Sequence, residues 1–226
     1  MPKRYLAEFI GTFFIVFAPI SVGAIGPNPG LLIAAIASGF PVLAMIYALG
    51  PISAAHFNPA VTLAFALTKK FPWNSVVPYW LAQLLGSACA AGLALILFGS
   101  PSGSHVPTDV SNLVRNLGVE ITISMMLMFV IMSVATDRRV SGAVPAIAIG
   151  LTVVVGVLIG GPITGGSMNP ARSFGPAVIA GGVAMQNYWI YIVGPVIGAA
   201  IGALAYEAVR LEPKQAKGAP DDLMPL

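Results

Sequence analysis

The sequence contains one motif twice, as GPISAAHFNPA at residues 50–60 and as GPITGGSMNPA at residues 161–171. The two copies align without a gap at a constant separation of 111 residues. Asn is a favoured helix N-cap, and proline fits the first helical position because its missing N–H would have no partner there. Each Asn-Pro-Ala therefore predicts the start of a helix, and the small Ala60 and Ala171 allow two such starts to touch.

The apolar segments that follow, about 57–68 and 169–180, are too short to cross a membrane. Twelve helical residues cover about 18 Å, roughly half of a hydrocarbon core of about 30 Å. Gly- and Pro-rich backbone at membrane depth is tolerated only where protein or water satisfies its polar groups. We therefore predict two re-entrant half-helices.

Composition places the whole chain in a bilayer. Of its 226 residues, 57% are hydrophobic and only 8% are charged, and the mean hydropathy is +0.89. Soluble domains carry about 25% charged residues, so soluble enzymes and nucleic-acid-binding proteins are excluded. One cysteine, Cys89, and two histidines leave no basis for a disulfide framework, a metal site or a cofactor site. Cys89 lies in an apolar run and is expected to be a small packing residue.

Six segments are long and apolar enough to span the membrane: about 5–26, 31–50, 74–99, 113–136, 142–161 and 188–211. Nine of the eleven Lys and Arg residues then lie on one side, at Lys3, Arg4, Lys69, Lys70, Arg138, Arg139, Arg210, Lys214 and Lys217. The positive-inside rule puts this side in the cytoplasm. We expect a multi-pass protein of the plasma (cell inner) membrane, with both termini and a short polar tail at 213–226 in the cytoplasm.

The repeat extends beyond the motif. Glu8 lies 50 residues before Asn58, and Glu120 lies 49 before Asn169. Each copy, about 5–99 and 113–211, contains three spans and one half-helix within a single channel domain, 1–212. Because three is odd, the second copy is inverted in the membrane, and inverted repeats place their site at the midplane between broken helices.

Two half-helices that meet at their N-termini define what could pass between them. Each tip carries about half a positive charge from the helix dipole, together with the N–H donors of an Asn side chain. Cations and protons meet an electrostatic barrier there. A water or hydroxyl group can accept hydrogen bonds from Asn58 and Asn169, so the pattern predicts a pore for neutral, hydroxyl-bearing molecules.

These motifs resemble those of the aquaporin (major intrinsic protein) family. The similarity includes Ser53-x-x-His56 through Thr62, Gly166-x-x-Asn169 through Ser173, and Ala7 to Thr12, and it runs from about residue 5 to 210. The resemblance implies an all-α, right-handed bundle of six transmembrane helices and two re-entrant half-helices. It also implies a homotetramer with one pore per subunit, and pore motifs at Asn58-Pro59-Ala60 and Asn169-Pro170-Ala171.

The family's outer constriction, carried over position by position, is formed by Ser38, Val157, Gly166 and Arg172. Arg172 is expected to donate hydrogen bonds to the solute and to repel cations. Water-selective members resemble a pattern with Phe and His where this chain has Ser38 and Val157, so we expect a wider constriction. A register in which Phe40 replaces Ser38 would instead narrow the pore.

Small filter residues followed by Ser173 look most like the nodulin-like intrinsic proteins, a branch associated with boric acid, silicic acid, arsenous acid and glycerol. The resemblance implies a passive channel for small neutral solutes, namely arsenous acid, boric acid and glycerol-like polyols, and for water. A water-selective aquaporin is one alternative, and an ion-coupled secondary transporter is another. No arrangement of catalytic side chains at one depth suggests an enzyme.

Three further titratable residues have expected roles within the pore. Glu8 and Glu120 either relay protons or accept backbone N–H bonds from the loops before the half-helices, and their symmetric placement favours the second role. His56 is expected to line or brace the pore, with a pH gate as the alternative. His105, between the third and fourth spans, is expected to be solvated.

Overall fold

Helices form wherever the sequence predicts an apolar span. The computed structural model describes residues 2–25, 29–99, 104–137, 140 and 142–210. The polar tail expected at 213–226 lies outside the described residues, as do the basic residues Arg138, Arg139, Lys214 and Lys217. Six helices in the described ranges are long and apolar enough to cross a membrane, which confirms the predicted all-α membrane fold.

The long helices and the two half-helices follow the predicted order, and their bounds are α1 (Pro2–Ile25), α2 (Leu31–Ser53), α3 (Pro59–Leu67), α4 (Val76–Phe98), α5 (Leu113–Thr136), α6 (Val144–Thr164), α7 (Pro170–Ala180) and α9 (Ile190–Val209). A 3-10 turn, η1 (Trp73–Ser75), precedes α4, and a five-residue helix, α8 (Gly182–Gln186), precedes α9. The sequence pattern did not predict α8, which is too short to have a periodicity of its own.

Two helices run further than predicted. The spans expected to end at residues 50 and 161 continue to Ser53 and Thr164, so that Pro51 and Pro162 lie inside α2 and α6. A proline in the last turn of a helix removes only one hydrogen bond of the ladder. Each helix ends instead at a residue in the left-handed conformation, and the N–H groups of Ala54 and Gly165 close the last turn.

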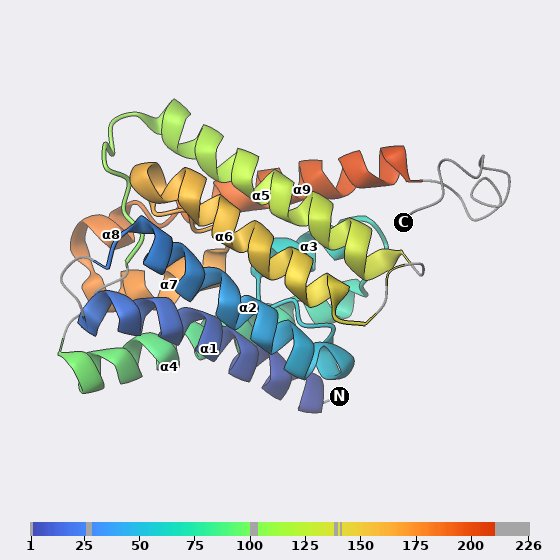
Figure 1. The fold of residues 1–226 in the computed structure, drawn as a ribbon, viewed down its shortest axis with the longest axis horizontal. Helices are drawn as coiled ribbons and strands as arrows, with labels where there is room; N and C mark the ends of the chain where they lie inside the picture. The colour runs from blue at the N-terminus through green and yellow to red at the C-terminus, as the bar shows by residue number, and fades with distance from the viewer. Residues whose placement is uncertain (1, 26–28, 100–103, 138–139, 141, 211–226) are drawn as a thin grey trace, which may run out of the picture.

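The long helices run side by side, and the half-helices lie at opposite ends of the bundle (Figure 1). Within the repeats, α1 packs on α4 and α5 packs on α9, while α2 and α6 pack on each other across the repeats. The half-helices also cross between repeats, because α3 packs mainly on α9 and α7 mainly on α4. The start of α1 and the end of α9 lie at the same end of the bundle (Figure 1).

Glycines allow the helices to approach to backbone contact. A Cβ atom added at Gly86 of α4 would collide with the carbonyl oxygen of Phe9 in α1. A Cβ at Gly198 of α9 would collide in the same way with the carbonyl oxygen of Ile121 in α5. Small residues at such crossings are typical of membrane helix packing. Cys89, expected to be a packing residue, is instead exposed on the outer surface.

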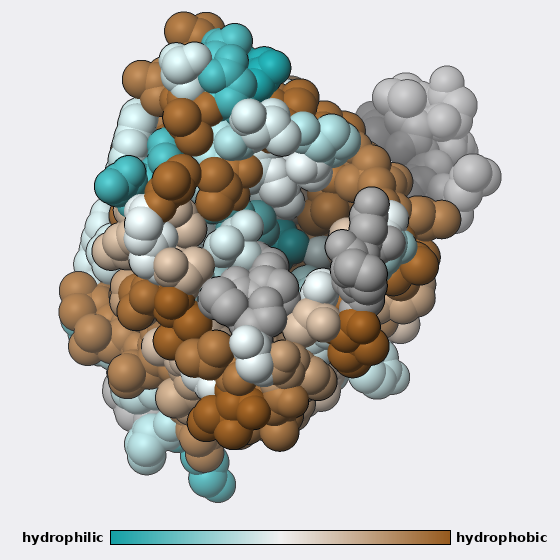
Figure 2. All heavy atoms as spheres, turned by 90° about the vertical axis from the view of Figure 1, so that its left-hand side faces the viewer, coloured by the Kyte–Doolittle hydropathy of each residue, from teal (hydrophilic) through white to brown (hydrophobic). Residues whose placement is uncertain are grey.

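Polar groups gather at the ends of the bundle. At the end where α1 starts, Lys70 and Arg210 both pair with Glu207, at 3.0 and 3.4 Å. Figure 2 shows the opposite end, where hydrophilic atoms lie at the bottom of a central hollow and hydrophobic residues cover most of the lower flank. Between the two ends, the half-helices meet at the centre of the bundle.

Candidate functional site

The two Asn-Pro-Ala motifs meet tip to tip at the centre of the molecule. Each Asn caps its own half-helix: the side-chain oxygen of Asn58 accepts from Ala60 N at 3.0 Å, and that of Asn169 accepts from Ala171 N at 2.9 Å. In both half-helices, proline occupies the first helical position directly after this cap, at Pro59 and Pro170.

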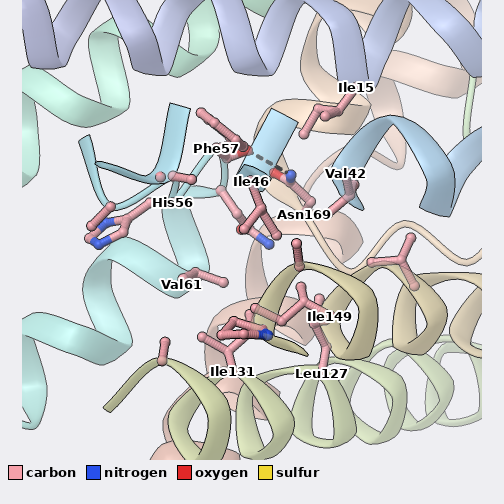
Figure 3. A pocket seen from close by; sticks show the side chains of 18 of the residues that line it. Ile15, Val42, Ile46, His56, Phe57, Val61, Leu127, Ile131, Ile149 and Asn169 are labelled. Atoms are coloured by element: carbon pink, nitrogen blue, oxygen red, sulfur yellow. Dashed lines mark hydrogen bonds between the residues drawn. The ribbon is translucent and has the colours of Figure 1, made fainter. Parts of the chain in front are cut away.

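Each Asn also reaches across to the opposite loop. Asn58 Nδ2 donates to the carbonyl oxygen of Met168 at 2.9 Å. Asn169 Nδ2 donates to the carbonyl oxygen of Phe57, also at 2.9 Å (Figure 3). A carboxamide nitrogen carries two hydrogens, so these bonds leave each Asn one further N–H. Asn58 and Asn169 both line the central cavity. Their remaining N–H groups are therefore available to a molecule between the two tips.

The two loop residues whose carbonyls accept these bonds have an unusual backbone conformation. Phe57 and Met168 have φ values of 48° and 57°, in the left-handed region that L-residues other than Asn and Asp rarely adopt. Such conformations cost about 1–3 kcal/mol each and persist only where surrounding contacts enforce them. Here both the N–H and the C=O of each strained residue are hydrogen-bonded to side chains.

Two buried carboxylates hold these loops. Glu8 accepts from the backbone N–H groups of His56 and Phe57 at 3.0 and 2.7 Å. Glu120 accepts from those of Ser167 and Met168 at 3.0 and 2.9 Å. Both carboxylates are fully buried, and neither lines the described cavity. This geometry satisfies the loop backbone inside the membrane and keeps both carboxylates out of the lining of the described cavity.

A cavity of about 710 Å³ leads from one end of the bundle to the half-helix tips. Its walls are mostly aliphatic, and side chains from α1, α2, α3, α5 and α6 converge on it (Figure 3). The aliphatic members include Ile15, Val42, Ile46, Val61, Leu127, Ile131 and Ile149. Polar contacts come from His56, Asn58, Ser167 and Asn169, and Arg172 lies at the far end. Such a lining suits small neutral molecules with an apolar surface.

The four residues of the expected constriction lie together. Arg172 Nη1 donates to the carbonyl oxygen of Gly166 at 2.8 Å, and Nη2 donates to Ser38 Oγ at 2.7 Å. A Cβ added at Gly166 would lie 3.0 Å from Val157 Cα, so these two positions are in contact. Of the four, only Arg172 lines the described cavity. Phe40 is 53% exposed on the outside of the bundle, so the alternative register does not place it in the pore.

The hydrogen bonds that Ser38 and Arg172 already make determine which of their O–H and N–H groups are left without a partner. Ser38 donates its single hydroxyl hydrogen to Ala34 O at 2.7 Å. Its hydroxyl therefore supports the guanidinium as an acceptor and presents no donor of its own. Arg172 Nε is buried and has no hydrogen-bond partner among the described residues. A guanidinium has five N–H groups, so Arg172 keeps donors beyond those that hold it in place.

The structure places the two histidines in equivalent surroundings. His56 lines the cavity, and its Nδ1 lies 3.1 Å from Thr62 Oγ1. The expectation that His105 is solvated is wrong: its side chain is buried, and its Nδ1 lies 3.0 Å from Ser173 Oγ. Sequence reasoning missed this contact because His105 lies in an irregular connection with no periodicity. Among the described residues, no group of three or more His, Cys, Asp or Glu side chains could hold a metal ion.

Comparisons with known proteins agree with this architecture. Residues 1–206 match the model of the Major intrinsic protein family. The chain is 45% identical to Aquaporin NIP1-1 of Oryza sativa subsp. japonica over 221 residues, covering 94% of this chain and 76% of that protein. It is 42% identical to Putative aquaporin NIP4-1 of Arabidopsis thaliana over 222 residues, covering 95% and 77%.

A solved structure shares the fold at low sequence identity. The aquaglyceroporin from Plasmodium falciparum matches with a TM-score of 0.83 at 21% identity, over 92% of this chain and 96% of that one. The duplicated motif, the paired half-helices and the NIP-type relatives all indicate the same family. The chain belongs to the major intrinsic protein family and is an aquaporin-type membrane channel.

Proposed function

We propose that this channel passively conducts water and small uncharged hydroxylated solutes, namely arsenous acid, boric acid and glycerol-like polyols, and excludes protons and ions. The observation that carries the proposal is the makeup of the constriction around Arg172. Its other members are a serine whose hydrogen is already donated, a valine and a glycine. None of these three residues carries an aromatic ring, which supports room for a solute larger than water beside the guanidinium.

The chemistry of the constriction favours neutral hydroxyl compounds. The free donors of Arg172 would bind solute oxygens, while Val157 would contact their apolar surface. The positive guanidinium and the two half-helix N-termini oppose cations in a low-dielectric pore. At the midplane, Asn58 and Asn169 would each donate an N–H to the same oxygen, which turns its lone pairs towards both tips and interrupts a chain of water molecules that could carry protons.

Assembly and location follow the same proposal. We infer a homotetramer in the plasma (cell inner) membrane, with one pore per subunit and both termini in the cytoplasm. Lys69, Lys70 and Arg210 lie near the bundle end where α1 starts, which supports a cytoplasmic location for that end. The cavity that reaches Asn58 and Asn169 then opens to the cytoplasm, and Arg172 lies on the outer side of the midplane.

The test is light scattering from proteoliposomes under osmotic gradients of sucrose, boric acid, arsenous acid and glycerol. Wild-type protein should accelerate both water efflux and solute uptake. Ser38→Phe should remove solute uptake and retain water flux, because an aromatic ring would occupy the space beside Arg172. Arg172→Ala should reduce discrimination among the solutes.

Two outcomes would contradict the proposal. Fast water flux with solute uptake at the rate of bare lipid would identify a water-selective channel. Uptake that requires an imposed proton or sodium gradient would identify a coupled transporter. The buried, loop-bound state of Glu8 and Glu120 argues against the second outcome, because neither carboxylate contacts the cavity.

A further inference from the structure

The first repeat contains a short hydrogen-bond chain that ends at the midplane. His56 Nδ1 lies 3.1 Å from Thr62 Oγ1, which donates to Asn58 O at 3.0 Å. A threonine hydroxyl has one hydrogen, and here the carbonyl of Asn58 accepts it. With that hydrogen on Asn58 O, we assign His56 Nδ1 as the donor to Thr62. The imidazole is the Nδ1–H tautomer, and its Nε2 lone pair is left as an acceptor.

The second repeat lacks the histidine of this chain. At the separation of 111 residues, Ser167 occupies the position of His56 and Ser173 occupies that of Thr62. The structure supplies an imidazole from elsewhere: His105, from the connection between α4 and α5, places its Nδ1 at 3.0 Å from Ser173 Oγ. A residue outside the duplicated motif thus completes the second copy.

The surroundings of the two rings match as well. The His56 and Tyr79 ring centroids are 5.2 Å apart, and those of His105 and Tyr191 are 5.6 Å apart. Each tyrosine hydroxyl donates to the last backbone carbonyl of the long helix that precedes its half-helix. The equivalence therefore includes the packing of the ring and the anchoring of its neighbour, in addition to one polar contact.

Counting hydrogens also orients the second chain. Ser167 Oγ lies 2.9 Å from Asn169 O, which can only accept, and with the Ser167 hydrogen assigned to this carbonyl, Ser173 donates to Ser167. In this assignment the Ser173 oxygen accepts from His105 Nδ1. The order runs from His105 Nδ1–H through both serines to Asn169 O. It parallels the order from His56 to Asn58 O, with one hydroxyl more.

This chain lies against the backbone that holds Arg172. Arg172 Nη1 donates to the carbonyl oxygens of Gly166 and Ser167, at 2.8 and 3.2 Å. On the other side, a Cβ added at Gly165 would lie 2.8 Å from His105 Cδ2. Residues 165–167 therefore lie between the imidazole of His105 and the guanidinium of Arg172. A shift of the imidazole would move the carbonyl oxygens to which the guanidinium is bound.

We propose that His105 is a positioning residue of the outer constriction. Its Nδ1–H completes the hydroxyl chain of the second repeat, and this contact fixes the carbonyls of Gly166 and Ser167 that orient Arg172. The inference rests on the proposed function of this constriction as the solute filter. His105 thereby links the segment before α5 to the proposed filter.

The first test does not depend on transport. The chain has two histidines, so protein labelled with ¹⁵N-histidine and purified without a histidine tag gives two imidazoles whose nitrogen shifts report the tautomer. Both should be neutral Nδ1–H forms. His105→Asn assigns the signals, and Ser173→Ala should change only that of His105. A His105 signal typical of a solvated ring, with Nε2–H dominant, would overturn the proposal.

The second test compares two replacements of His105 in proteoliposomes. Asn can place an N–H donor near the position of Nδ1, whereas Leu fills a similar volume without a donor. His105→Leu should raise the ratio of glycerol to water permeability by about fivefold, the effect of losing one hydrogen bond. His105→Asn should retain the ratio of the wild type. Thr108→Val in the same connection is the matched control, because its backbone N–H bond to Ile163 O remains.

A double variant shows whether His105 acts through Ser173. The combination of His105→Leu and Ser173→Ala should shift the permeability ratio no further than either change alone, as expected for coupled partners. Additive shifts, or equal shifts in the Asn and Leu variants, would overturn the proposal. If His105→Leu fails to fold, His105→Asn and Ser173→Ala provide the same comparison. If wild-type protein conducts water and no solute, the solute function fails while the histidine spectra still decide this inference.

Discussion

Gly166 is the member of the proposed constriction with the least room for a side chain. Its φ is +65°, and an added Cβ would lie 3.0 Å from Val157 Cα and 3.2 Å from Gly156 O. We expect Gly166→Ala to lower solute permeability at least about tenfold and to destabilise the fold by about 1–2 kcal/mol, the cost of a left-handed alanine. Stopped-flow scattering and thermal unfolding in detergent measure the two effects. Gly99→Ala, also at positive φ but with open space around it and away from the described cavity, controls for backbone strain and should leave solute selectivity unchanged.

His105 gives a prediction for pH. Burial, and to a smaller extent the nearby charge of Arg172, lower the pKa of His105 well below its ordinary value of 6.5. The folded protein therefore keeps this imidazole neutral as pH falls through 6.5, while the unfolded chain takes up a proton. Stability rises with pH wherever the unfolded state binds more protons, so the stability that His105 contributes is complete above 6.5 and is lost as pH falls below it.

We accordingly expect permeability to stay flat between pH 7.5 and 5.5, whereas the free energy of unfolding declines by up to about 1.4 kcal/mol per pH unit for this group. Thermal unfolding at several pH values measures the decline, and His105→Asn should reduce its slope. A permeability that changes in step with protonation near pH 6.5 would show that the ring is accessible.

Among single residues, the sequence predicted the two helix caps of the repeated motif but did not predict the buried position of His105. Asn58 and Asn169 could be predicted because capping is local: the cap, the proline and the start of the helix are consecutive. The contact of His105 with Ser173 joins positions 68 apart in the chain. One indication was present in the sequence: Ser167 stands in the second repeat where the first repeat has His56. Nothing in the sequence identifies which distant side chain takes the place of that imidazole.

Among the elements, the two re-entrant loops depend on single carboxylates. Glu120 accepts from two backbone N–H groups and from Thr164 Oγ1. In Glu120→Gln one oxygen becomes an NH₂ group, which faces a backbone donor and leaves it without an acceptor. We expect a loss of about 1.5–3 kcal/mol in unfolding free energy, the range for hydrogen bonds to a charged group, together with reduced flux.

Glu207→Gln is the control for this change, because it removes the same charge from a partly exposed ion pair with Lys70. Surface ion pairs contribute about 0–1 kcal/mol, so thermal unfolding should barely change. Equal losses in both variants would mean that net charge, and not the loop bonds, explains the effect.

The starts of the half-helices were easier to predict from the sequence than the ends of the long helices. The half-helices begin at Pro59 and Pro170 as the motif predicts. The long helices α2 and α6 continue three residues past Gly50 and Gly161, although a Gly-Pro pair favours termination. Tertiary contacts extend them: the hydroxyls of Ser53 and Thr164, in the extra turn, bond to Glu8 and Glu120. Such bonds involve distant segments, so local patterns cannot predict them.

For the whole molecule, the duplication determines a pseudo-symmetric architecture in which function is asymmetric. Both repeats use the same cap, carboxylate brace and tyrosine anchor. Only the second carries an arginine after its motif, at Arg172, where the first has Val61. The described cavity extends from the opposite end to this arginine. Arg172 therefore lies on one side of the midplane, and the orientation of the chain decides which compartment the proposed filter faces.

The orientation can be tested at the two ends of α4. Asn74 and Asp109 are exposed and lie before and after this helix, so they must be on opposite sides of the membrane. In a Cys89→Ala background, we expect a membrane-impermeant maleimide to label Asp109→Cys in intact cells and to label Asn74→Cys only after permeabilisation. The physical reason is that the connection near Asn74 contains Lys69 and Lys70, which the positive-inside rule retains in the cytoplasm, whereas residues 99–112 contain no Lys or Arg. The reverse pattern would place Arg172 and His105 on the cytoplasmic side, so that solutes arriving from outside would meet the aliphatic cavity before the constriction.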